Sequence, residues 1–266
     1  MMDLDFLWNL DSALAVGLSV LGLALFLGFE SAMDRAVLMR DLGIPIGLGG
    51  SLIGTQQLVY SAVEGTLVAD DIYGWTGTAF LTLLYGGVFS ALGFFLSGSG
   101  RPQAKTIQNQ KWLWRRKLII GLGGMSITLP AMVAYGGAEL FFQPIPATIF
   151  LVTAVIAILT GRRGHYLSNL SQGCLIASMT SVMVGILILF KGEVESGLMV
   201  SGVGLIYGIS GYVWIYIFTY STDYRPHISA TRTNWHWLEL AGFLIFMFLA
   251  PDTLLDNYQE AAVQEQ

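Results

Sequence analysis

Charged residues are scarce in this sequence. They make up 12% of its 266 residues, whereas soluble domains carry about 25%. Hydrophobic residues make up 54%, and the mean hydropathy is +0.64. A surface that faces water cannot be built from so few charges. The composition therefore excludes an ordinary soluble domain and predicts lipid as the solvent of the apolar surface.

Cysteine and histidine are also scarce. Cys174 is the one cysteine, so an internal disulfide and a cysteine metal cluster are both excluded. The histidines at 165, 227 and 236 are too few and too scattered for a metal site. No serine-elbow motif and no cysteine–histidine pairing is present, and no basic run suits a nucleic acid. We expect no enzyme, no cofactor, no metal and no nucleic-acid partner.

Long apolar runs dominate what is present. A membrane-spanning helix needs about 20 apolar residues, and eight runs come close to that length. The runs are continuous rather than alternating, which indicates helices rather than a barrel. We expect an all-α, polytopic integral membrane bundle of about eight transmembrane helices, folded as a single domain over 1–266. The expected spans are 12–29, 42–61, 74–97, 118–137, 145–161, 171–190, 196–220 and 236–251.

Lysine and arginine predict the orientation of these spans. Every one of the 13 basic residues except Lys191 falls in the loops after the first, third, fifth and seventh runs. Because such loops stay in the cytoplasm, we expect both termini on the non-cytoplasmic side. The chain starts with acidic residues, which favours a retained first span over a cleaved signal. A bacterial inner (plasma) membrane is the expected location.

A short motif recurs along the chain. The pentapeptide at 46–50 reappears at 120–124, and the Tyr85-Gly86 pair is echoed by Tyr207-Gly208. These echoes predict three related helix hairpins, at 42–97, 118–161 and 171–220. The alternative is a likeness of composition, because small residues recur wherever membrane helices approach closely. On either interpretation we expect glycines at helix contacts, namely Gly50, Gly54, Gly86, Gly124 and Gly208.

A few polar and proline residues lie inside the spans. Ser51, Thr55, Gln56 and Thr82 could line an ion pathway. They could instead hydrogen-bond between helices and hold them together. Proline bends a helix by removing one backbone hydrogen bond. Pro45 and Pro130 are therefore candidate kinks or hinges.

The hairpin at 42–97 carries two further motifs. Pro45 is followed by Gly50-Ser51-Leu52-Ile53-Gly54, and the returning run holds Leu81-Thr82-Leu83-Leu84-Tyr85-Gly86. This piece resembles the last two membrane helices of the MotA/TolQ/ExbB family, and most closely the flagellar stator subunits. Those proteins carry a large cytoplasmic domain ahead of this hairpin, and this chain does not. We therefore expect a rebuilt relative rather than a flagellar motor part.

The resemblance implies a function. Ion passage along small and hydroxyl residues would drive movement in a partner. Pro45 would match the kink proline, Thr82 a pathway threonine, and Ser51 would replace a second one. The family uses a single-span partner with a membrane carboxylate as the ion carrier. The expected spans here contain no carboxylate near their middle, so a partner would have to supply it.

Three functions remain open on the sequence. The first is a membrane subunit of a protein complex with an ion-conducting or energy-coupling, stator-like role, surrounded by lipid and by other membrane subunits. The second is a stand-alone transporter or channel for a small solute. The third is a non-catalytic structural or assembly protein of the membrane, which the shortage of chemical groups favours.

Overall fold

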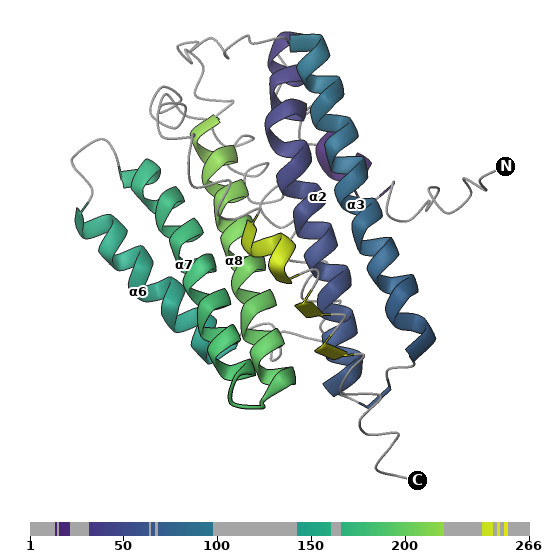
Figure 1. Ribbon diagram of the computed structural model, residues 1–266. Helices are drawn as coiled ribbons and strands as arrows, with labels where there is room; N and C mark the ends of the chain where they lie inside the picture. The colour runs from purple at the N-terminus through teal and green to yellow at the C-terminus, as the bar shows by residue number, and fades with distance from the viewer. Residues whose placement is uncertain are drawn as a thin grey trace, which may run out of the picture.

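The computed structural model is helical almost throughout the residues that it describes, with no strand among them. Five helices are labelled in Figure 1: α2 (Ala32–Val63), α3 (Ala69–Ser97), α6 (Pro144–Thr160), α7 (Tyr166–Leu189) and α8 (Val194–Tyr220). The described residues are 14, 16–21, 32–63, 65–66, 69–97, 143–160, 166–220, 241–246, 249–250 and 253–254.

Four of these helices are long and apolar enough to cross a membrane. Their apolar segments are Arg35–Ala62, Thr76–Ser97, Asn169–Leu189 and Val194–Ile217. Helix α6 is apolar but shorter. The all-helical class is confirmed, and these lengths are consistent with an integral membrane protein.

The count of eight spans goes beyond the described residues. The expected span at 118–137 lies outside them, and those at 12–29 and 236–251 lie only partly inside. The described parts of these two are helical.

Three helices begin five or more residues before the apolar runs suggest. Helix α2 starts at residue 32 and not at 42, α3 starts at 69 and not at 74, and α7 starts at 166 and not at 171. Hydropathy predicts which residues lie in lipid and not where a helix begins. Arginine and methionine favour helix, as at Arg35 and Met39, so the helix extends beyond the apolar run. The segment 30–41, expected to be a loop, is therefore helical from residue 32 onward.

Neighbouring helices run antiparallel. In Figure 1, α2 and α3 form one hairpin, α7 and α8 form another, and α8 lies between α2 and the α6–α7 pair. Over an 18-residue apolar stretch of each helix, 83% of the residues are buried in α8 but only 28% in α3. Helix α8 is therefore the centre of the bundle, and α3 lies at its edge.

The backbones of α2 and α3 lie in direct contact. A Cβ added at Gly47 would lie 2.8 Å from Thr82 O, and one added at Gly86 would lie 2.8 Å from Gly47 Cα. Real Cβ atoms do not approach this closely, so only small residues fit. We call this contact the α2–α3 seam. Its members are Gly43, Gly47, Gly50 and Gly54 of α2, and Ala79, Thr82, Gly86, Ser90 and Gly93 of α3.

The hairpin of α7 and α8 is built in a similar way. A Cβ at Gly197 would lie 2.6 Å from Gly185 O, and one at Gly208 would lie 2.9 Å from Ser178 Oγ. Each hairpin also turns near a glycine with positive φ, Gly65 (68°) or Gly192 (86°). Side chains rarely adopt such angles, so glycine allows both turns to be short.

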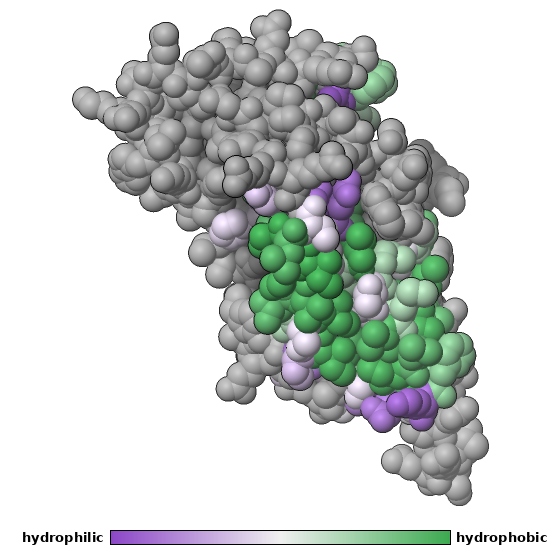
Figure 2. Space-filling model, turned by 90° about the vertical axis from the view of Figure 1, so that its left-hand side faces the viewer, coloured by the Kyte–Doolittle hydropathy of each residue, from purple (hydrophilic) through white to green (hydrophobic). Residues whose placement is uncertain are grey.

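One flank of the bundle is an exposed apolar face. Figure 2 shows hydrophobic residues gathered on the side where α6 and α7 lie, with hydrophilic residues beyond the ends of the patch. Exposed side chains of this flank include Leu151, Ile156 and Leu159 of α6, and Met183 and Leu187 of α7. Lipid tails suit such a face, as a membrane-spanning bundle requires.

Gly86 and Gly87 allow a matched test of the α2–α3 seam. We expect Gly86→Leu to lower the free energy of unfolding by at least about 1–3 kcal/mol through overpacking. Gly87→Leu should change it by no more than about 0.5 kcal/mol, because no atom lies within 4 Å of the added Cβ. Thermal unfolding in mild detergent would compare the two variants. Equal melting temperatures would contradict the seam.

Candidate functional site

The hydroxyl groups of Ser51 and Thr82 meet inside the α2–α3 seam. Their oxygens lie 3.0 Å apart. Ser51 also donates to Ala79 O. Thr82 Oγ1 lies 2.7 Å from Ala79 O and 3.3 Å from Gly47 O. Both side chains are buried, and their hydroxyls are surrounded by backbone carbonyls of the two helices.

Gln56 lies on a different face of α2. Residues 51 and 56 are about 140° apart around a helix. The Gln56 amide donates from Nε2 to Leu198 O of α8 at 3.2 Å. A Cβ at Gly202 would collide with this amide, so glycine at that position makes room for it. Gln56 therefore joins α2 to α8, while Ser51 and Thr82 join α2 to α3.

Thr55 hydrogen-bonds within its own helix. Its hydroxyl donates to Ser51 O at 3.0 Å. Leu52, which lies between Ser51 and Thr55 in the sequence, is fully buried. Of the four expected pathway residues, the structure brings Ser51 and Thr82 into contact and directs Gln56 to a separate interface.

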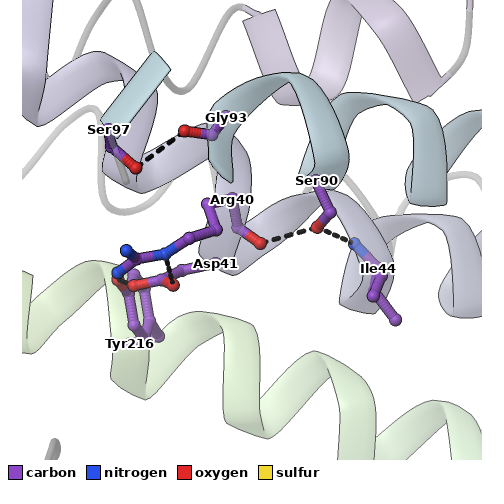
Figure 3. Close-up of polar contacts among 7 residues, drawn as sticks. All are labelled: Arg40, Asp41, Ile44, Ser90, Gly93, Ser97 and Tyr216. Atoms are coloured by element: carbon purple, nitrogen blue, oxygen red, sulfur yellow. Dashed lines mark hydrogen bonds and ion pairs between the residues drawn. The ribbon is translucent and has the colours of Figure 1, made fainter. Parts of the chain in front are cut away.

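A charged cluster lies nearer the start of α2. Arg40 Nε is 3.0 Å from Asp41 Oδ1, and the Tyr216 hydroxyl of α8 donates to Asp41 Oδ2 at 2.5 Å (Figure 3). The side chains of Arg40 and Asp41 are 20% and 7% exposed. A partly buried ion pair with a hydrogen bond from a second helix therefore links α2 to α8.

This cluster was not predicted from the sequence. The apolar run in the sequence begins at 42, which predicts that Arg40 and Asp41 lie in a loop. Two signals pointed to the cluster: adjacent opposite charges beside an apolar run, and a tyrosine inside the expected span 196–220. Neither signal identifies the partner, because Tyr216 is 175 residues from Asp41.

Ser90 of α3 reaches into the same turn of α2. It donates from Oγ to Arg40 O at 2.6 Å and accepts from Ile44 N at 3.2 Å (Figure 3). In a regular helix these two backbone groups bond to each other. The next residue is Pro45, which lies inside α2 and has no N–H to donate to Asp41 O. The turn that carries Asp41 is therefore held partly by α3.

The remaining predicted positions are distributed as follows. Gly50 faces Thr82, Gly54 faces Ala79, Gly86 faces Gly43 and Gly47, and Gly208 faces Ser178 of α7. Gly124 and Pro130 lie outside the described residues.

Among the side chains that the structure describes, three buried oxygens have no hydrogen-bond partner: Gln56 Oε1, Ser178 Oγ and Ser210 Oγ. They lie on different contacts of the bundle. Within the described ranges no group of three His, Cys, Asp or Glu residues could hold a metal ion. Arg40, Asp41 and Tyr216 form a cluster with ionic chemistry within the described helices. It can exchange ions or protons at a carboxylate, and it can hold two helices together.

Comparison of the chain with protein-family models, with curated proteins and with solved structures gave no match.

Tyr216 allows a direct test of the contact between α2 and α8. A hydrogen bond to a charged group contributes about 1.5–3 kcal/mol, so we expect Tyr216→Phe to lower the free energy of unfolding by about that amount. Tyr166→Phe is the control, because Tyr166 is exposed at the start of α7. Chemical unfolding in detergent would measure both variants. A Tyr216→Phe variant as stable as the parent would show that the hydrogen bond contributes nothing.

Proposed function

We propose that this chain is a membrane subunit of a protein complex with an energy-coupling role, in which Asp41 is the ionisable group. One observation carries the proposal. Asp41 lies inside a helix long enough to cross a membrane, and its buried carboxylate is bonded to a second helix. Ionisable residues inside membrane helices are costly, and they usually mark ion pathways or coupling sites.

The neighbouring helix supports a location of Asp41 below the membrane surface. Gly93 of α3 is level with Ala36 and Arg40, because a Cβ there would meet their backbones. The next three residues of α3, at 94–96, are exposed and apolar. Lipid-facing side chains thus extend past the level of Arg40 and toward the start of α2. These side chains favour a position of the charge pair within the hydrocarbon core rather than among the headgroups.

The chemistry of the pair favours coupling over simple conduction. Arg40 and Asp41 together are neutral, which lowers the cost of burying each charge. A cation or proton that binds Asp41 competes with Arg40 and with the Tyr216 hydroxyl. Binding therefore weakens the link between α2 and α8, and ion occupancy becomes a change in helix contact. This step is what an energy-coupling subunit requires.

The rest of the proposal follows from the sequence. The resemblance of 42–97 to stator-type proteins implies ion-driven movement. Asp41 could supply the carboxylate that the resemblance alone assigned to a partner. Charge asymmetry favours an orientation with both termini outside the cytoplasm, and a bacterial inner membrane is the proposed location. Other membrane subunits remain the proposed partners.

Asp41→Asn tests this function. The protein, with whatever co-purifies from native membranes, is reconstituted in liposomes that contain a pH-sensitive dye, and a potassium diffusion potential drives proton entry. A parallel series uses a sodium-sensitive dye. We expect Asp41→Asn to reduce the flux about tenfold or more, which corresponds to about 1.4 kcal/mol on the barrier.

Glu195→Gln is the matched control, because it removes the same charge at an exposed position in the first turn of α8. Its flux should equal that of the parent. Flux through Asp41→Asn at the parent rate, in folded protein, would sink the coupling role.

A structural role is the second candidate, and the α2–α3 seam favours it. The hydroxyls of Ser51, Thr82 and Ser90 all bond to backbone carbonyls at helix contacts. Side chains used in this way hold helices together and leave little capacity for a moving ion. A protein whose polar groups all serve packing would be an assembly platform rather than a coupling device.

Thr82→Val separates the two roles, because valine keeps the shape of threonine and loses the hydroxyl. If Thr82 serves packing only, the unfolding free energy should fall by about 0.5–1.5 kcal/mol, and the flux should not change. A loss of flux without a loss of stability would instead place Thr82 on the ion pathway. Thr82→Ser, which keeps the hydroxyl, should restore whichever property was lost.

A further inference from the structure

We propose that α2 contains a hinge at residues 42–45, which Ser90 of α3 holds closed. The hinge divides α2 into a first segment, 32–41, and a second segment, 46–63. The first segment carries Asp41. Closing the hinge aims the carboxylate at Tyr216, and opening it withdraws the carboxylate from α8.

The hydrogen bonds of this turn support the hinge. The Ser90 hydroxyl bonds to both Arg40 O and Ile44 N, the two groups that a regular helix joins directly. Pro45 donates nothing to Asp41 O, and its ring crowds that carbonyl. Two successive rungs of the helical ladder are therefore altered, because Arg40 O and Ile44 N also bond to a side chain of another helix and Asp41 O lacks its usual donor. Inserted side chains and prolines are recognised causes of helix bending.

Helix α3 packs along one side of the hinge and contacts both segments of α2. A Cβ at Gly93 would lie 2.6 Å from Ala36 O in the first segment. A Cβ at Gly86 would lie 2.8 Å from Gly47 Cα in the second segment. Ser90 stands between these two contacts. The α2–α3 seam thus touches both segments, and Ser90 is the residue of α3 that bonds to the turn between them.

The opposite side of the hinge faces α8. There Asp41 accepts the hydrogen bond from Tyr216, and the first segment buries Val37 and Leu38. Gln56 in the second segment keeps its own bond to Leu198 O. The second segment therefore stays attached to α8 when the first one moves. Ser90 and Tyr216 hold the same segment from two sides.

The hinge extends the proposed function by giving the Asp41 contact a moving part. Its test measures movement of the helix and not ion flux. The hinge can therefore fail while the flux depends on Asp41, and the flux can fail while the hinge operates.

Fluorine NMR of a small trifluoromethyl label would test the hinge. The single cysteine is removed by Cys174→Ala, and a new one is introduced by Met39→Cys in the first segment. A second labelled protein carries Ser61→Cys in the second segment. Both positions are partly buried, so the labels report local surroundings. Each label is recorded in the parent, in Ser90→Ala and in Ser97→Ala.

We expect Ser90→Ala to raise the population of a second resonance at position 39 about fivefold, the effect of losing one typical hydrogen bond. The label at position 61 should not change. Ser97→Ala is the control, because Ser97 donates to Gly93 O of its own helix at 2.7 Å. Adding Pro45→Ala to Ser90→Ala should return the population toward the parent value, because it restores the missing N–H donor.

Three results would overturn the hinge. The first is an unchanged signal at position 39 in Ser90→Ala. The second is an equal change at positions 39 and 61, which would mean general loosening of the bundle. The third is a second resonance that persists when Pro45→Ala accompanies Ser90→Ala. Rescue by Pro45→Ala is the decisive observation, because a serine that only fills space would not respond to it.

Discussion

The close approach of α2 and α3 is the constraint on which the other contacts of this hairpin depend. Lipid tails are as apolar as leucine, so helices in a membrane associate through packing and hydrogen bonds. A serine side chain is short, and Ser90 reaches Arg40 O and Ile44 N only because Gly43 and Gly86 leave no atoms between the backbones. The Ser51–Thr82 contact needs the same closeness.

The α2–α8 interface follows a different design. Polar contacts hold its two ends, at Asp41 with Tyr216 and at Gln56 with Leu198. Between them α2 buries Leu48 and Leu52. Residues 41 and 56 are about 22 Å apart along a helix, so the two contacts span most of a bilayer core. A water-filled path between α2 and α8 would have to cross these leucines.

Local features of the sequence predicted the helices well. The runs at 171–190 and 196–220 cover most of α7 and α8. The length of an apolar run depends only on residues that are adjacent in the sequence, so it can be predicted without knowledge of the fold. The glycine motif also marked Gly50 and Gly54, which lie in the α2–α3 seam. The sequence also shows hydroxyl residues at 51 and 82 inside apolar runs, and the structure brings these two hydroxyls into contact.

The start of α2 and the partners of its side chains could not be predicted in the same way. The apolar run begins at 42, whereas the helix also includes Arg40 and Asp41, whose charges neutralise each other and whose carboxylate accepts a hydrogen bond from a partner on another helix. That partner, Tyr216, comes from a distant part of the chain. The direction of Gln56 likewise depends on Gly202. Such pairings arise from the packing of whole helices, and no local pattern encodes them.

The shortness of α6 has a consequence for the surrounding bilayer. Its 17 residues span about 26 Å, whereas the 28-residue apolar segment of α2 spans about 42 Å. A hydrocarbon core of about 30 Å is thicker than the length of α6 and thinner than the length of the apolar segment of α2. Mismatch of this kind is relieved by local thinning of the bilayer or by tilting, at a fraction of a kcal/mol per ångström. Where thinning rather than tilting relieves the mismatch, lipids beside α6 form a shallow depression in the membrane, and a protein with a similarly short helix would meet the least resistance there.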